Sequence, residues 1–206
     1  MTVEGGEGAG KSTQVARLVA ALGRAGIAAE ATREPGGSPG AEAIRALLLQ
    51  GDDARWDAVS ETLLFVAARH DHVARTIRPA LAAGRWVVCD RFTDSTVAYQ
   101  GYGRGLPLAA LEDLRRFGLG DFRPDLTLIL DLPVAEGLAR AARRGAAADR
   151  FERLDPAFHH RLRDGFLAIA AAEPDRCAVI DASGDIDAVH RAIAGTVAHR
   201  LKVSLV

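Results

Sequence analysis

A glycine-rich octapeptide near the N-terminus constrains this chain more than any other segment: Gly5-Gly6-Glu7-Gly8-Ala9-Gly10-Lys11-Ser12. It lies between a short apolar run and an amphipathic stretch, which predicts a strand, a loop and a helix in that order. Glycines let the loop backbone turn its N–H groups toward phosphate oxygens, and the N-terminus of the helix adds partial positive charge. The pattern predicts a nucleoside triphosphate site in which Lys11 reaches the β- and γ-phosphates and Ser12 holds Mg²⁺.

The rest of the chain alternates short apolar runs with amphipathic stretches, a pattern typical of an α/β fold with a mainly parallel sheet. The expected strands are residues 2–4, 27–32, 86–90, 126–132 and 177–181. The expected helices are residues 11–25, 40–49, 57–83, 94–99, 108–118, 134–143, 156–172 and 186–202. Right-handed crossovers place the loops after the strands along one edge of this five-stranded sheet, where ligands bind. We expect one domain over residues 1–206.

The first expected strand is shorter than a central strand usually is, because only four residues precede the glycine loop. Either the sheet tolerates a short strand, or the natural chain begins further upstream.

Composition argues against several classes of function. The net charge of -1 at pH 7 gives no indication of a nucleic-acid or membrane-surface partner. No apolar run approaches the roughly 18 residues of a membrane span, and no basic segment followed by an apolar one opens the chain. Cys89 and Cys177 lie beside short apolar runs, as expected of buried thiols in a reducing compartment. We therefore expect a cytoplasmic protein.

Two expected strands end in an aspartate, Asp90 after Val-Val-Cys and Asp131 after Leu-Ile-Leu. Either carboxylate could serve the metal from the edge of the sheet, and spacing alone does not choose between them. Arg91 follows Asp90 directly and adds a cation at the same edge.

The stretch 142–153 is short of bulky apolar residues and rich in arginine and small residues. This composition suits an exposed, mobile lid over a binding site, and it suits a plain surface loop equally well.

Several segments together resemble the thymidylate kinase family. They are GGEGAGKST (5–13), TREPGG (32–37), LLFVAAR (63–69), DRFTDSTVAYQGYGRG (90–105), LGDFRPDLTLILDL (119–132) and DRFE (149–152). Many nucleotide-binding proteins share the glycine loop, whereas the combination with REPGG, F-x-x-x-R and AYQG is much more specific. The resemblance implies a P-loop kinase fold and transfer of the γ-phosphate of ATP to dTMP, giving dTDP and ADP.

The resemblance also implies where dTMP binds. Phe65 and Arg69 are four residues apart, so they share a helix face, and family members use these positions to hold thymine. Thr96 and Gln100 are implied near the base edge, with Tyr99 close to the sugar. The full implied set is Glu7, Arg33, Pro35, Phe65, Arg69, Arg91, Ser95, Thr96, Tyr99 and Gln100. Within it, Arg33 and Arg91 clamp the phosphate, Glu7 contacts the sugar hydroxyl, and Glu34-Pro35 resembles a cis-proline turn.

The implied ATP site consists of Gly5, Gly6, Glu7, Gly8, Ala9, Gly10, Lys11, Ser12, Thr13 and Arg140, with Arg140 lying over adenine. Mg²⁺ would be held by Ser12 and, through water, by Asp90. The implied catalytic residues are Lys11, Arg91, Glu7 and two lid arginines, Arg144 and Arg150, with Arg143 as the next candidate. Family members form homodimers through helices that include the region 57–83, so we expect a homodimer.

Three alternatives stay open at this stage. A related small kinase acting on another nucleotide would share the glycine loop but not the combination of REPGG, F-x-x-x-R and AYQG. A nucleotide-dependent switch that binds a protein partner is a different class, although the chain has no N-K-x-D guanine motif. A degenerate binder would hold ATP and dTMP without turnover.

Overall fold

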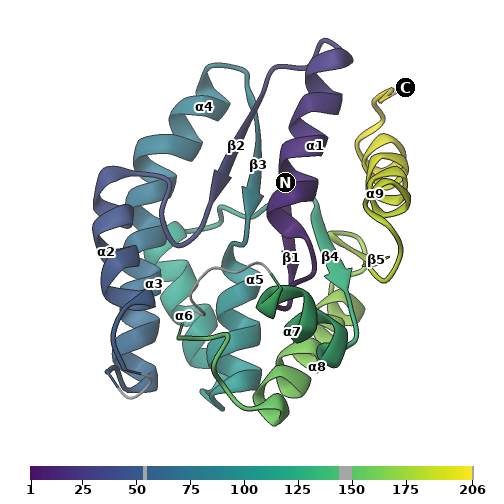
Figure 1. The fold of residues 1–206 in the computed structure, drawn as a ribbon. Helices are drawn as coiled ribbons and strands as arrows, with labels where there is room; N and C mark the ends of the chain where they lie inside the picture. The colour runs from purple at the N-terminus through teal and green to yellow at the C-terminus, as the bar shows by residue number, and fades with distance from the viewer. Residues whose placement is uncertain (53–54, 144–149, 206) are drawn as a thin grey trace.

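A parallel five-stranded sheet with the order β2-β3-β1-β4-β5 forms the centre of the computed structural model, which describes residues 1–52, 55–143 and 150–205 (Figure 1). Its strands are β1 (Thr2–Gly5), β2 (Ala29–Arg33), β3 (Trp86–Asp90), β4 (Thr127–Asp131) and β5 (Cys177–Asp181). The expected strands are confirmed, with ends that move by at most two residues. β1 is short but central, because it pairs with β3 on one side and β4 on the other.

The helices begin and end close to the expected residues. They are α1 (Lys11–Arg24), α2 (Pro39–Leu49), α3 (Ala58–His72), α4 (Arg78–Ala82), α5 (Thr93–Thr96), α6 (Leu108–Leu119), α7 (Val134–Ala142), α8 (Pro156–Ala172) and α9 (Ile186–Leu201). Side chains of Ser38, Asp57, Asp155 and Asp185 accept backbone N–H bonds at the starts of α2, α3, α8 and α9. Among the helices that the structure describes, none is long and apolar enough to cross a membrane.

Two stretches have π-helical hydrogen bonding, η1 (Val73–Ile77) and η2 (Val97–Gly103). η1 joins α3 to α4, so the expected helix 57–83 is nearly continuous. η2 prolongs α5 to Gly103, so the expectation that this helix ends at residue 99 is wrong. The glycines there serve packing: a Cβ on Gly101 would lie 2.6 Å from Leu108 Cδ2, and one on Gly103 would lie 2.5 Å from Phe158 Cε2.

The core has one layer on each face of the sheet because side chains alternate along a strand. Leu128 and Leu130 of β4 pack with residues of α1 and α9, such as Leu18 and Ile193. Ile129 points to the other face and packs with α8 and η2. Since all strands run the same way, their carboxyl ends and the loops that follow lie along one edge (Figure 1).

Candidate active site

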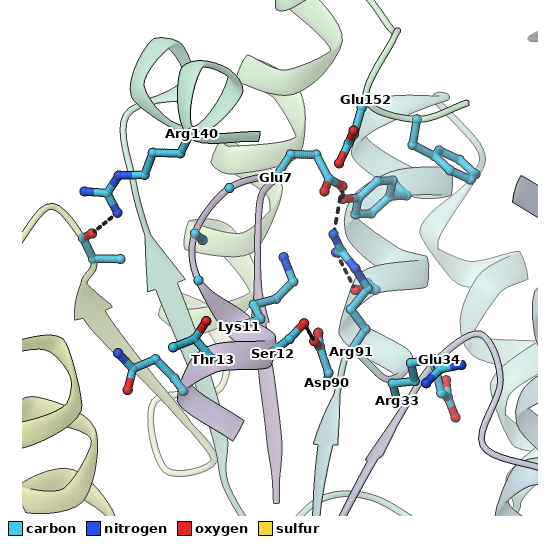
Figure 2. Close-up of a pocket in the computed structure, with 18 of the residues that line it drawn as sticks. Glu7, Lys11, Ser12, Thr13, Arg33, Glu34, Asp90, Arg91, Arg140 and Glu152 are labelled. Atoms are coloured by element: carbon cyan, nitrogen blue, oxygen red, sulfur yellow. Dashed lines mark hydrogen bonds and ion pairs between the residues drawn. The ribbon is translucent and has the colours of Figure 1, made fainter. Parts of the chain in front are cut away.

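One cavity of about 840 Å³ lies along the carboxyl edge of the sheet. Its lining comes from the glycine loop, the ends of β2 and β3, α3, α5 and η2, and the loop between β5 and α9. Figure 2 shows Arg140 on one side of the glycine loop and Arg33 with Glu34 on the opposite side. The cavity therefore extends past the glycine loop on both sides.

The glycine loop has the backbone geometry that its sequence predicts. Gly8 and Gly10 have φ angles of 69° and 86°, which favour glycine, and a Cβ on Gly8 would collide with the carbonyl of Gly137. Lys11 begins α1 and donates from Nζ to the carbonyls of Gly5 (3.1 Å) and Gly6 (2.7 Å). Burial, assisted by the nearby Arg91 cation, lowers the pKa of Lys11 to about 8, although Glu7 opposes the shift.

The two strand-end aspartates, Asp90 and Asp131, have different partners in the structure. Ser12 Oγ donates to Asp90 Oδ2 at 2.5 Å, so the hydroxyl and this carboxylate lie together at the start of α1 (Figure 2). Asp131 instead accepts two bonds from Arg163, at 2.7 and 2.8 Å. Hard oxygen donors beside a phosphate loop suit Mg²⁺, so the pair of Ser12 and Asp90 fits this ion. Asp131 is held as the partner of an arginine.

A compact charge cluster connects the glycine loop to β3 and η2. Glu7 Oε1 accepts from Arg91 Nη2 at 2.8 Å and from the Tyr99 hydroxyl at 2.5 Å. The Arg91 guanidinium lies 4.9 Å from the centre of the Tyr99 ring, and its φ of 69° shows that the backbone turns sharply there. Burial alone would raise the pKa of Glu7, but the charges of Arg91 and Lys11 and the Tyr99 hydroxyl outweigh it and hold the pKa at about 2.

Glu4 is a buried carboxylate behind this cluster that our sequence reasoning missed. It accepts from the backbone N–H of Phe92 (2.7 Å) and from Ser95 Oγ (2.6 Å), which fixes the start of α5. Burial and the neighbouring Asp94 raise its pKa to about 7. The sequence feature that could have revealed it is a charged residue within a strand expected to be buried.

The other half of the cavity contains the residues expected around a pyrimidine. Arg69 donates from Nη1 to Thr96 Oγ1 (2.9 Å) and from Nη2 to the carbonyl of Phe92 (3.0 Å). Phe65 lies on the same lining and faces Phe151, with ring centres 5.9 Å apart. Gln100 also lines the cavity and donates to Glu61.

The turn after β2 completes this half. The peptide bond between Glu34 and Pro35 is cis, as the resemblance implies. Arg33 lines the cavity and pairs with Glu42 at 3.0 Å. Arg45 donates to the carbonyl of Pro35 at 2.6 Å and also lines the cavity. Our sequence reasoning assigned no role to four lining residues of this half. Arg45 and Leu49 have neighbours with no recognisable pattern, whereas Phe151 and Glu152 lie in the DRFE segment that carries the resemblance.

The arginines expected in or near the lid differ in where the structure places them. Arg144 lies outside the described residues. Arg150 is fully buried, pairs with Glu61 and donates to the carbonyl of Leu48, so the expectation that it belongs to an exposed segment is wrong. It is not among the residues that line the cavity. Arg140 does line it and donates to the carbonyl of Ala182 at 3.0 Å, beside the loop that leads into α9.

A phosphate-binding loop that shares one cavity with an arginine- and aromatic-lined half defines a P-loop kinase of the nucleoside monophosphate class. The family model described as Thymidylate kinase matches residues 3–193. The chain is 57% identical over 201 residues to the thymidylate kinase of Caulobacter vibrioides, covering 98% of this chain and 96% of that protein. It is 57% identical over 185 residues to the thymidylate kinase of Rhizorhabdus wittichii, covering 89% of each.

A solved thymidylate kinase from Ehrlichia chaffeensis superposes with a TM-score of 0.76 at 36% identity, covering 95% of this chain and 96% of that one. The chain therefore belongs to the thymidylate kinase family, ATP-dependent phosphotransferases that form dTDP from dTMP. This membership contradicts the alternative of a nucleotide-dependent switch.

Proposed function

We propose that this chain binds ATP with Mg²⁺ on the glycine loop, binds dTMP in the half of the cavity beside Phe65 and Arg69, and transfers the γ-phosphoryl group in line between them. The single observation that carries the proposal is the continuity of the cavity, which is lined by Lys11 and Ser12 as well as by Phe65 and Arg69. Two nucleotides bound in these halves would direct their phosphates toward the cluster of Glu7 and Arg91.

The acceptor is a phosphate oxygen, which is already anionic near neutral pH, so catalysis needs alignment and charge neutralisation more than a strong base. Lys11 and Arg91, which both line the cavity, would supply cations to the transferred group. Ser12 and Asp90 would hold Mg²⁺, which neutralises charge on phosphate oxygens when bound. Arg140 would cover adenine. Catalytic roles for Arg144 and Arg150 stay predictions.

On the acceptor side, Phe65 would stack on the pyrimidine, and Arg69 would donate to its carbonyl oxygen with Thr96 and Gln100 nearby. Tyr99 and Glu7 would face the sugar. Arg33, Arg91 and the newly found Arg45 would hold the phosphate, because guanidinium groups offer paired donors to phosphate oxygens.

A coupled assay of ADP release tests this assignment. With dTMP, dUMP, dCMP and AMP compared at fixed ATP and Mg²⁺, we expect dTMP to give the highest kcat/KM. Phe65→Ala should raise the KM for dTMP steeply and leave the KM for ATP unchanged. An unchanged dTMP KM would remove Phe65 from the base site, and absence of turnover with every acceptor would favour a degenerate binder.

We also propose a homodimer built on α3 and α6. Phe117 of α6 is 92% exposed, and Val59 and Leu63 of α3 are 55% and 49% exposed. The two helices adjoin, because His70 Nδ1 donates to the carbonyl of Gly118 at 2.7 Å. A second copy would cover these apolar side chains. Sedimentation should show a dimer that Phe117→Glu dissociates, and a monomeric parent protein would exclude this interface. A cytoplasmic location stays a prediction.

A further inference from the structure

A chain of buried polar contacts lies behind the Arg69 side chain. Arg69 Nε donates to Glu34 Oε2 at 2.6 Å, and His72 Nδ1 lies 3.0 Å from the other carboxylate oxygen, Oε1. His72 Nε2 lies 2.7 Å from Thr32 Oγ1. His72 has no exposed surface, and the side chains of Glu34 and Arg69 are only 3% and 5% exposed. The contacts thus run from the partly buried Thr32 of β2 through buried side chains to the base half of the cavity.

Chemistry fixes the direction of the bond between His72 and Glu34. A carboxylate can only accept, so Nδ1 of His72 carries a proton and donates to Glu34 Oε1, while Nε2 forms the bond with the Thr32 hydroxyl. Both oxygens of Glu34 are thereby engaged, one by the histidine and one by the arginine. Glu34 therefore has little freedom to turn away from Arg69.

The backbone is shaped to seat the His72 ring. Gly37 has a φ of 86°, and a Cβ there would lie 2.6 Å from Thr32 Oγ1 and would collide with the ring. Thr76 Oγ1 donates to the carbonyl of Gly37 at 2.7 Å, which fixes this close approach. The second glycine of REPGG thus makes room for the imidazole. Cys89 Sγ is within 4.8 Å of ligand atoms of His72 and Glu34, but the Arg69 cation on Glu34 argues against a metal there.

We propose that His72 is a positioning residue for the pyrimidine site, acting through Glu34 to hold Arg69 in the orientation that reads the base. The inference rests on the base-binding role of Arg69 proposed above. Arginine offers only donors, so a fixed Arg69 favours a pyrimidine with a carbonyl at the position where cytosine has an amino group. Loosening Arg69 should weaken dTMP binding and reduce discrimination against dCMP. His72 itself need not touch either nucleotide.

Variants at His72 separate positioning from general packing. His72→Leu removes both ring bonds, and we expect the KM for dTMP to rise about tenfold or more, with kcat and the KM for ATP nearly unchanged. The ratio of kcat/KM for dTMP over dCMP should fall. His72→Asn keeps an N–H donor near the place of Nδ1 and should recover most of the dTMP KM. His190→Asn on α9 is the matched control, a half-buried histidine outside the cavity lining, and should leave the dTMP KM unchanged.

A double-mutant cycle tests the route through Glu34. In a Glu34→Gln background, His72→Leu should cause no further rise in the dTMP KM, because the carboxylate that it orients is gone. Additive effects would overturn the inference, and so would an equal KM rise in His190→Asn or no rescue by His72→Asn. Arg69→Met distinguishes the two proposals. If it raises the dTMP KM and His72→Leu does not, only the role of His72 fails; if it leaves the KM unchanged, the base site itself is wrongly placed.

Discussion

Arg150 and Glu61 form an ion pair in which neither side chain has exposed surface, and replacing Arg150 with methionine tests what this pair contributes. Methionine retains much of the apolar length of the side chain but leaves the Glu61 carboxylate without its main cation. Removing one partner of a buried ion pair costs about 3–5 kcal/mol of folding free energy. Two donors remain on Glu61, Gln100 at 3.0 Å and Arg104 at 3.4 Å. We therefore expect a loss near the lower limit, about 3 kcal/mol.

Urea denaturation followed by circular dichroism measures this loss. The free energy of unfolding of a natural domain is roughly 5–15 kcal/mol, so a loss of this size lowers the urea concentration at the unfolding midpoint strongly. Arg75→Met is the matched control, because the Arg75–Asp71 pair is exposed on the arginine side (68%) and should contribute less than about 1 kcal/mol. The double variant Arg150→Met/Glu61→Met should regain much of the stability, since neither charge of the pair stays buried without the other, and Arg104, whose side chain is 24% exposed, keeps contact with solvent.

A loss below about 1 kcal/mol in Arg150→Met would refute the assignment of Arg150 as a structural cation. The same variant tests the catalytic prediction when its turnover is measured without urea, at a temperature well below its thermal unfolding midpoint. A transition-state arginine is worth about 10³- to 10⁵-fold in turnover. A fall of that size with unchanged stability would show that Arg150 acts on the phosphates, in a position different from the one seen here.

Three other predictions follow from the site. Asp90→Asn should raise the Mg²⁺ concentration for half-maximal turnover about tenfold, and Asp131→Asn should not; equal effects would contradict the separation of the two aspartates. The kcat/KM for ATP should fall as pH rises through about 8, where Lys11 loses its charge in the free enzyme, and a level profile up to the ordinary lysine pKa would exclude this. Glu4 has a raised pKa, so its protonated carboxyl contributes stability that is present below about 4.5 and lost as pH rises to about 7. The free energy of unfolding of the parent should therefore decline relative to Glu4→Gln across that window, and parallel pH profiles would refute it.

Local patterns were enough to predict the sheet and the glycine loop. β3, β4 and β5 are short apolar runs, and all five strands end at a glycine or a charged residue, so the apolar pattern and these residues together mark the strand ends. The expected helix 94–99 ended too early. The structure continues it past Gly101 and Gly103, whose missing side chains make room for Leu108 and Phe158. A sequence cannot show these partners, because they lie in other helices.

The choice between Asp90 and Asp131 was hidden for a similar reason. Both follow three apolar residues at the end of a central strand, so their local contexts are equivalent. The difference comes from Arg163, on α8, which reaches Asp131 across 32 positions of sequence. Ser12 reaches Asp90 across 78 positions, through the parallel pairing of β1 with β3.

Arginine content did not show which cations are exposed in this chain, because several arginines form internal ion pairs. Guanidinium groups can satisfy a buried carboxylate with several donors, and such pairs join distant segments, for example Arg69–Glu34, Arg150–Glu61 and Arg176–Asp94. The carboxylates of these pairs could have been identified first in the sequence, since a carboxylate in an apolar segment needs a cation as its partner. Assigning an arginine to each buried acid would have predicted a buried partner for Arg150. Four arginines that line the cavity, Arg33, Arg45, Arg91 and Arg140, would then have been the first candidates to contact a substrate.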